Sequence, residues 1–181
     1  MSTLSVDTIQ GKTTAGTVAM PAGMVVQTAY SSTTTKIHSS TSQADVTLIT
    51  ADAFTPKFSS SHIHIILNMH FGYYNPNGGL QVVRAISGGA TTFGIGDVPD
   101  TFNGGNGFWT ADEFVLASAS DDFYTIAQMG GYVVDTNHST TNAITYSLRA
   151  TSIGSINFNR AQTAPENGNA RSSITLMEIK Q

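Results

Sequence analysis

The sequence has no cysteine, only one tryptophan, and few charged residues. Without cysteine, a disulfide scaffold, cysteine-ligated zinc, an iron–sulfur centre and thiol catalysis are all excluded. Charged residues make up 11% of the 181 positions, under half of the roughly 25% that is typical of a soluble domain. The eight Lys and Arg are scattered and the formal net charge is −4. Nucleic-acid binding is therefore not expected, because it requires clustered cations.

Long apolar runs are also missing. No stretch approaches the roughly 18 consecutive apolar residues of a membrane span, and residues 1–7 have neither a basic nor an apolar segment of the kind that directs export. We therefore expect a soluble chain with no membrane insertion. Hydroxyl side chains are abundant instead, with 44 Ser and Thr among 181 residues. The surface is expected to consist mainly of hydroxyls, amides and glycine.

Residues 1–23 differ from the remainder of the chain. Their apolar side chains are too sparse to form a core, and Met20-Pro21-Ala22-Gly23 ends the segment. We interpret residues 1–23 as an attachment arm that becomes ordered against other subunits or a larger assembly, followed by a head domain over residues 24–181. A free tail or an edge strand of the head is the alternative. The residues expected to make the attachment are Leu4, Val6, Ile9, Val18 and Met20.

Short β-rich runs separated by turn residues fill the rest of the chain. Period-2 alternation is clearest over residues 62–71, with five apolar side chains on one face. The other face presents His62, His64, Ile66, Asn68 and His70. The turn signal at residues 75–79 is followed by a second alternating run from Leu80, which we expect to be the partner strand of a hairpin.

Seven further runs are predicted to be strands, and no window sustains a helical apolar pattern. The predicted fold is all-β, an antiparallel β-sandwich of the jelly-roll kind. The predicted strands are residues 24–29, 46–50, 108–117, 123–129, 144–150, 155–158 and 173–179.

The last of these strands has apolar residues on both faces, which predicts cover on both sides. Such a strand lies either in the middle of its sheet or against a neighbouring subunit. The residues expected at an interface between subunits are Ile174, Leu176, Met177 and Ile179.

Few residues suggest catalysis. Asp121 and Asp122 stand at a predicted turn, where carboxylates accept backbone N–H bonds. Asp112 and Glu113 either pair with Arg84 or face water. No nucleophile elbow, phosphate-binding loop or zinc-protease motif is present. We expect no enzyme activity and no cofactor.

The pair His62 and His64 permits one metal hypothesis. Two histidines on the same face of a strand, repeated around a threefold axis, would supply six nitrogen ligands to a transition metal. The alternative, which we favour, is that these rings fill a half-polar sheet face with local hydrogen-bond partners.

Two glycine-rich loops, residues 72–79 and 101–109, combine aromatic and amide side chains, a chemistry that suits sugars or protein surfaces. The alternative is that the aromatic residues belong to the core and the glycines only permit the turns. The candidate binding residues are Tyr73, Tyr74, Asn75, Asn77, Asn103, Asn106 and Trp109.

Both ends of the chain resemble one family. Residues 4–10 (LSVDTIQ) and 17–27 (TVAMPAGMVVQ), together with residues 156–160 (INFNR) and 172–179 (SSITLMEI), are similar to the ends of short tail-fibre and virion structural proteins of marine bacteriophages, including cyanophages. The middle of the chain fits more loosely, through residues 61–68 and 94–97. These motifs have no catalytic chemistry of their own.

The resemblance implies a homotrimeric phage appendage in the virion, assembled in the host cytoplasm, with the arm bound to other virion proteins and the head projecting. A tail fibre that contacts a host glycan or protein and a capsid decoration, or head fibre, both fit. A fibre usually has a long repetitive shaft, and no such shaft follows Gly23. A carbohydrate-binding module is the alternative from a different functional class.

Overall fold

The computed structural model describes residues 21–39, 43–72, 78–95, 109–111, 126–152, 156–161 and 170–181. These residues form strands, turns and irregular segments, and contain no helix. No helix long and apolar enough to cross a membrane occurs in this part of the chain. The strands are β1 (Val25–Thr33), β2 (Ile37–Ser39), β3 (Gln43–Thr50), β4 (His62–Phe71), β5 (Gly78–Ile86), β6 (Thr91–Thr92), β7 (Trp109–Ala111), β8 (Ala127–Asp135), β9 (Ile144–Ser152), β10 (Ile156–Phe158) and β11 (Ser172–Ile179).

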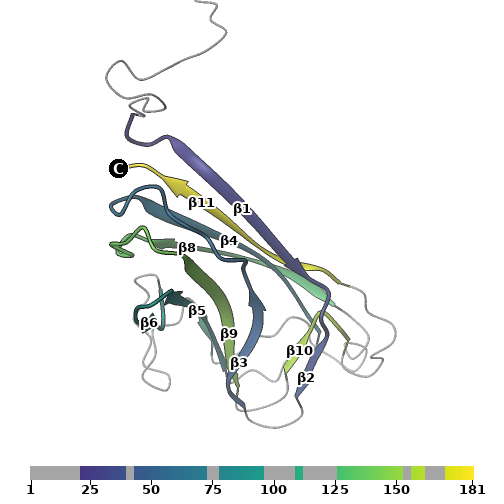
Figure 1. The fold of residues 1–181 in the computed structure, drawn as a ribbon. Coiled ribbons are helices and arrows are strands. Elements are labelled where there is room, and N and C mark those ends of the chain that lie inside the picture. Colours follow the sequence, from purple (N-terminus) through teal and green to yellow (C-terminus); the bar gives the residue numbers. More distant parts are fainter. Residues whose placement is uncertain are drawn as a thin grey trace, which may run out of the picture.

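One antiparallel sheet, here called sheet A, contains β1, β11, β4 and β8 side by side (Figure 1). β11 pairs with the first part of β4, and β10 pairs with its last residue, Phe71. Since β8 occupies the opposite edge of β4 throughout, β11 and β10 lie end to end along the same edge. β1 and β2 pair with β11 and β10, respectively, and complete that side of the sheet.

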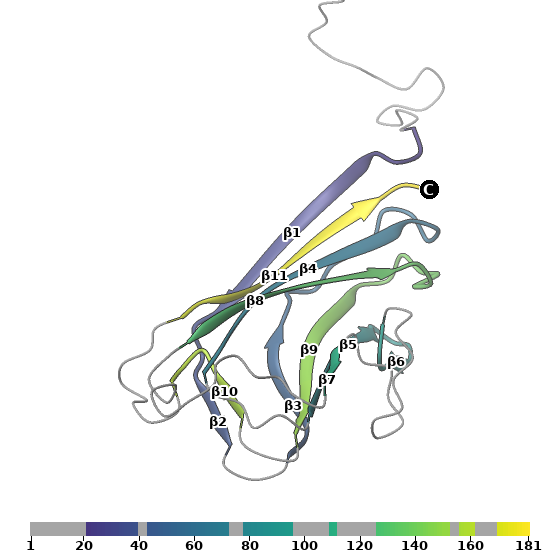
Figure 2. The ribbon, with the colours of Figure 1, turned by 180° about the vertical axis from the view of Figure 1, so that it is seen from behind.

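The second antiparallel sheet, sheet B, has the order β3-β9-β5-β6 (Figure 2). β6 and β7 both pair with the edge of β5 that β9 leaves free, near opposite ends of that strand. The backbone of Phe54, in the segment between β3 and β4, pairs with Ile144 at the start of β9.

The chain passes repeatedly from one sheet to the other, which produces a jelly roll. β2 and β3, β3 and β4, β4 and β5, and β8 and β9 are all consecutive strands in different sheets. The predicted all-β sandwich is therefore confirmed, but the predicted hairpin between β4 and β5 is wrong. β4 lies between β11 and β8, whereas β5 pairs with β9, β6 and β7.

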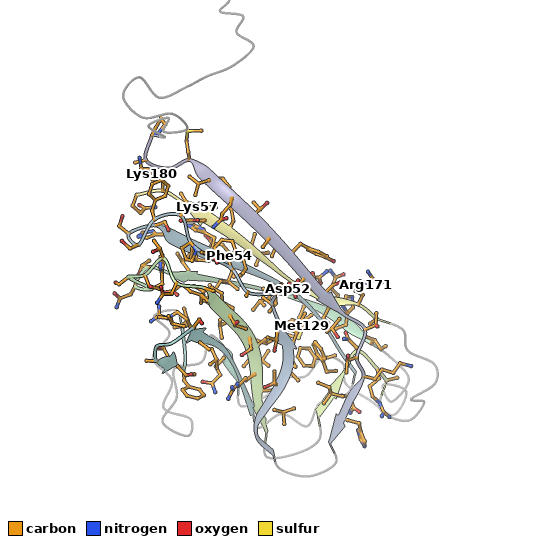
Figure 3. The ribbon with its side chains drawn as sticks, viewed as in Figure 1. Asp52, Phe54, Lys57, Met129, Arg171 and Lys180 are labelled. Atoms are coloured by element: carbon orange, nitrogen blue, oxygen red, sulfur yellow. The ribbon has the colours of Figure 1, made fainter. Side chains whose placement is uncertain are left out.

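The core lies between the sheets and comes mainly from the inward positions of alternating strands. All five apolar residues on the predicted dry face of β4 are buried, as are Ile174 and Leu176 of β11. Figure 3 shows the side chains that fill the space between the layers, with Phe54 and Met129 labelled among them. The largest fully buried apolar side chains are Ile63, Ile65, Leu67, Met69, Ile144, Tyr146, Leu148, Phe158, Ile174 and Leu176.

The last strand is central in its sheet, which is one of the two alternatives that its sequence left open. β11 pairs with β1 on one side and with β4 on the other. A strand was predicted over residues 123–129. The observed strand β8 lies further along the chain, at Ala127–Asp135, and includes Gly130 and Gly131. The three-residue strand β2 was not predicted from the sequence.

Candidate functional site

A buried carboxylate closes one end of the sandwich. Glu178 is the inward residue near the end of β11, and its side chain is fully buried. The backbone N–H groups of Lys57 and Phe58 donate to it at 2.9 Å. The Ser61 hydroxyl donates at 2.7 Å, and the Gln27 amide at 2.6 Å. Burial by itself would raise the pKa of Glu178, but these donors together hold that pKa below its ordinary value.

Beside this carboxylate, an ion pair connects the two sheets. The Nη1 atom of Arg84, on β5, lies 2.7 Å and 2.8 Å from the two carboxylate oxygens of Asp135, on β8. The Tyr146 hydroxyl donates to the same carboxylate at 2.8 Å. Burial, with the adjacent Asp135 charge and hydrogen bond, raises the pKa of Tyr146 well above its ordinary range. The phenol therefore stays protonated and remains a hydrogen-bond donor.

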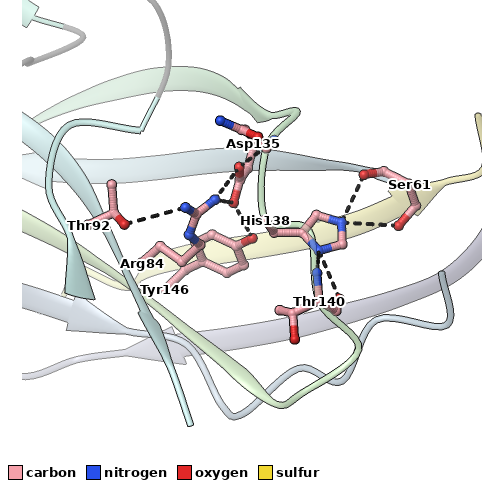
Figure 4. Close-up of polar contacts among 8 residues, drawn as sticks. Ser61, Arg84, Thr92, Asp135, His138, Thr140 and Tyr146 are labelled. Atoms are coloured by element: carbon pink, nitrogen blue, oxygen red, sulfur yellow. Dashed lines mark hydrogen bonds and ion pairs between the residues drawn. The ribbon is translucent and has the colours of Figure 1, made fainter. Parts of the chain in front are cut away.

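A serine and a histidine meet in the same region (Figure 4). The hydroxyl of Ser61 lies 3.3 Å from Nε2 of His138, but Nε2 is closer, at 2.8 Å, to the carbonyl oxygen of Ser61. When Nε2 donates to that carbonyl, it cannot accept the hydroxyl proton, which is directed instead to Glu178. Both residues are also almost fully buried. The arrangement fits a structural hydrogen-bond network and not a nucleophile with its general base.

The outward face of sheet A, which points away from the core, presents large side chains to solvent. One row of paired residues crosses all four strands, from Tyr30 on β1 through Thr175 and Ile66 to Tyr132 on β8. Tyr30 is 60% exposed, Ile66 39% and Tyr132 58%. Large side chains with apolar rings or branches are thus presented to solvent in a line.

The outward positions of this sheet contain no Lys, Arg, Asp or Glu within the strand residues that the structure describes. We call the outward positions of β1, β11, β4 and β8 the uncharged face. Its residues are Val25, Thr28, Tyr30 and Ser32 of β1, Ser173, Thr175, Met177 and Ile179 of β11, His62, His64, Ile66, Asn68 and His70 of β4, and Gln128, Gly130, Tyr132 and Val134 of β8.

The histidines of the metal hypothesis lie on the uncharged face. The ring of His64 contacts the Tyr132 hydroxyl through Nδ1, and the two ring centroids are 5.6 Å apart. Burial and the neighbouring His62 lower the pKa of His64. Across the described part of the chain, no three His, Asp or Glu side chains gather into a possible metal site. A site shared between copies stays a hypothesis.

Most of the predicted loop residues lie outside the described residues, namely Tyr73, Tyr74, Asn75, Asn77, Asn103 and Asn106. Trp109 is the first residue of β7, where its backbone pairs with Leu80. Gly72 follows the last residue of β4, and Gly78 is the first residue of β5. Gly72 lies at the end of the sandwich where Phe71 pairs with Ala127. The described ends of the predicted loop over residues 72–79 therefore lie at that end, and residues 73–77 lie outside the described residues.

The attachment residues Leu4, Val6, Ile9, Val18 and Met20 also lie outside the described residues. The point from which they extend is described. Gly23 has a φ of 84°, which favours glycine. Its N–H donates to the carbonyl oxygen of Lys180 at 2.7 Å. The base of residues 1–20 therefore lies beside the end of β11, at the opposite end from Gly72.

The four predicted interface residues divide between two faces. Ile174 and Leu176 are covered by the chain's own core. Met177 and Ile179 point outward and are half-buried. Only Met177 and Ile179 are accessible to another subunit, and a role for them at an interface remains a prediction.

Sequence reasoning missed the buried polar cluster around Glu178 and Arg84, although a signal was present. Arg84 falls in the alternating set with Leu80 and Val82, and Glu178 falls in the set with Ile174 and Leu176. A charged residue on a dry strand face predicts a buried partner. The partner of Arg84 is Asp135, whereas the predicted candidates Asp112 and Glu113 lie outside the described residues.

No protein-family model matches the chain, and no curated protein matches it. Among solved structures, it is similar to the VP2 subviral particle of infectious bursal disease virus, with a TM-score of 0.40 and 11% identity over 91% of this chain. It is also similar to a chain in the structure of the Gx strain of the same virus, with a TM-score of 0.37 and 13% identity over 86% of this chain. The chain spans 37% of the length of each of those chains.

Proposed function

We propose that the chain is a non-enzymatic structural protein of a virus particle, and specifically the head of a bacteriophage appendage. The arm over residues 1–23 would bind other virion proteins, and the jelly roll would project from them as a homotrimer. Assembly would take place in the host cytoplasm. The loops at residues 73–77 and 101–109 would then be available to a host surface glycan or protein.

The observation that favours this proposal most is that the arm and a candidate binding loop are at opposite ends of the sandwich. The base of the arm, at Gly23, is hydrogen-bonded to Lys180 at one end. The candidate loop at residues 73–77 is attached at the other end, through Gly72 and Gly78. An appendage subunit needs this arrangement, because the end that attaches must be separate from the end that meets the host.

Two further considerations support the proposal. The jelly roll recurs in viral capsid proteins, although it also recurs in lectins, so the architecture gives only an analogy. The buried Ser61, His138 and Glu178 are fully engaged with one another and with the backbone. Their polar chemistry therefore serves stability.

Labelled particles test the proposal. Particles assembled with a tagged chain, extended after Gln181, would be imaged with a gold probe for the tag. We expect the label on the particle, and its position on the tail or on the shell would distinguish a tail fibre from a capsid decoration. A chain lacking residues 1–20 serves as the matched variant and is expected to be absent from particles. Unlabelled particles, or normal incorporation of the truncated chain, would contradict the proposal.

The alternative of a carbohydrate-binding module has its own test. A glycan array probed with the purified chain would show selective binding if that alternative held. Selective glycan binding together with unlabelled particles would favour a carbohydrate-binding module over a virion subunit.

A further inference from the structure

We propose that the uncharged face of sheet A is the surface through which copies of this chain bind one another. This inference rests on the proposed function and identifies the part of the subunit that makes the assembly. The partner is another copy of the same chain, and the contact involves the outward side chains of β1, β11, β4 and β8.

The absence of charge is the first argument. Surfaces of small soluble domains usually have about a quarter to a third of their residues charged, yet none of the outward positions of sheet A is charged. Charges do flank this face. Arg171 precedes β11 and Lys180 follows it, and Figure 3 shows them near opposite ends of sheet A. A face without charges can meet its own copy with no like-charge repulsion and no buried unpaired ion.

The other sheet provides a contrast. Arg149 belongs to an outward position of β9, and its guanidinium lies 5.3 Å from the ring centroid of the exposed Phe93. The outward face of sheet B therefore has a fixed charge that is partly covered by the chain itself. Sheet A has no comparable cover among the described residues.

The exposed row across sheet A is the second argument. Tyr30, Ile66 and Tyr132 remain between 39% and 60% exposed although they stand on a rigid sheet. Burial of a large apolar side chain favours association, and tyrosine is enriched among the residues that dominate binding energy. A copy placed on this row would bury all three side chains.

The extent of the face matches a small specific interface. Four strands about 4.8 Å apart, each about 25 Å long, cover about 500 Å² on each copy. Two copies would bury about 1,000 Å² in total, which is near the lower limit for a biological interface. The contact is therefore expected to be of moderate affinity and to be reinforced when the arms are also bound.

Histidine gives this interface a pH dependence. His62, His64 and His70 are the titratable imidazoles of the uncharged face. The groups paired beside them are Ile179, Met177, Val134 and Gln128, with the Tyr132 hydroxyl against His64, and none of these is a carboxylate. Glu178 and Asp135, on the same strands, point into the core. Protonation of His64 in acid, below its lowered pKa, would place positive charge on both facing copies and separate them.

Mass measurement of the full-length chain tests the inference. Light scattering at about pH 7.5 is expected to give an oligomer, and the apparent dissociation constant at about pH 5 is expected to rise at least about tenfold. Ile66→Asp should give a monomer with an unchanged circular dichroism spectrum. Thr47→Asp, on the exposed outward face of sheet B, is the matched control and should remain oligomeric. If Ile66→Asp does not fold, Tyr30→Asp on the edge strand replaces it.

A native chain that is monomeric at about 100 µM, a concentration at which interfaces of ordinary strength are occupied, would overturn the inference. So would an Ile66→Asp or Tyr30→Asp variant that is as oligomeric as Thr47→Asp. These results are independent of particle labelling. A labelled particle with a monomeric chain would leave the proposed function standing, and an oligomer with unlabelled particles would leave only the interface standing.

Discussion

Arg84 and Asp135 join the two sheets of the sandwich through a buried ion pair. The guanidinium Nη1 lies 2.7 Å from Oδ1 of the carboxylate, and the two side chains are 10% and 2% exposed. Arg84 belongs to sheet B and Asp135 to sheet A, so the pair fixes the separation of the layers at the end near the base of the arm. Breaking this pair from one side should be costly, because the remaining charge would stay buried without its partner.

We therefore expect Asp135→Asn to destabilise the fold by about 3–5 kcal/mol, the usual cost of an unpaired buried charge. Urea denaturation at neutral pH measures this change. Asp52→Asn is the matched control, since Asp52 is exposed, and its effect should stay within about 0.5 kcal/mol. Equal stability of the two variants would mean that the ion pair contributes little.

Glu178 should make stability depend on pH. Its folded-state pKa is held below the ordinary value, so its stabilising contribution is fully present above the unfolded-state pKa of about 4.3. That contribution is lost as the pH falls through the lower, folded-state pKa. We expect Glu178→Gln to lose about 2–4 kcal/mol at neutral pH, because buried donors lose a charged acceptor.

The measurement is the free energy of unfolding as the pH falls from about 7 through the unfolded-state pKa of about 4.3 and below it. The native chain should lose more stability across this range than Glu178→Gln does. Parallel curves for the two proteins would show that another group controls the acid sensitivity.

Adjacent residues of β11 should respond differently to the same truncation. Leu176 is buried in the core and Met177 faces outward. Leu176→Ala is expected to cost about 2–5 kcal/mol through the cavity that it leaves. Met177→Ala should cost less than about 1 kcal/mol in the dissociated chain and should mainly weaken association. Thermal unfolding at low protein concentration separates the two, and similar melting temperatures would contradict the assignment of faces.

Two glycines provide a test of close backbone packing. A Cβ at Gly72 would overlap the carbonyl oxygen of Arg160, whereas a Cβ at Gly130 would meet nothing within 4 Å. Gly72→Ala is therefore expected to destabilise the fold by about 1–3 kcal/mol through strain. Gly130→Ala should be neutral or stabilising by up to about 1 kcal/mol, because alanine restricts the unfolded chain. Chemical denaturation of both variants measures the two changes in the free energy of unfolding. A Gly72→Ala variant as stable as the native chain would contradict the close contact.

Strand alternation in the sequence was sufficient to predict the fold class and much of the core. Ile63, Ile65 and Leu67 share one face of β4, and all three are buried as expected. β11 likewise buries Leu176 on one face, whereas Met177 on the other face is only half-buried. Such patterns report burial directly, because side chains of a strand point to alternate faces.

Pairing between strands was not predictable in the same way. The turn signal after β4 suggested a local hairpin, but β5 pairs with β9, so that Leu80 lies opposite Ala150. Both arrangements bury the same alternating faces, and only the packing of the complete chain distinguishes them. Glu178 was overlooked for a related reason, because its donors Lys57 and Ser61 are distant in sequence.

The pairing of Val25 with Ile179 has a consequence for biosynthesis. β1 leaves the ribosome long before β11, so its hydrogen-bonding edge has no partner while the residues between Thr33 and Ser172 are synthesised, at about 5–20 residues per second. During that interval, an unfilled strand edge on one nascent chain can capture the β11 segment of a neighbouring chain on the same messenger RNA. Exchanged strands are therefore an expected by-product of crowded synthesis, and slower translation or lower expression should reduce them.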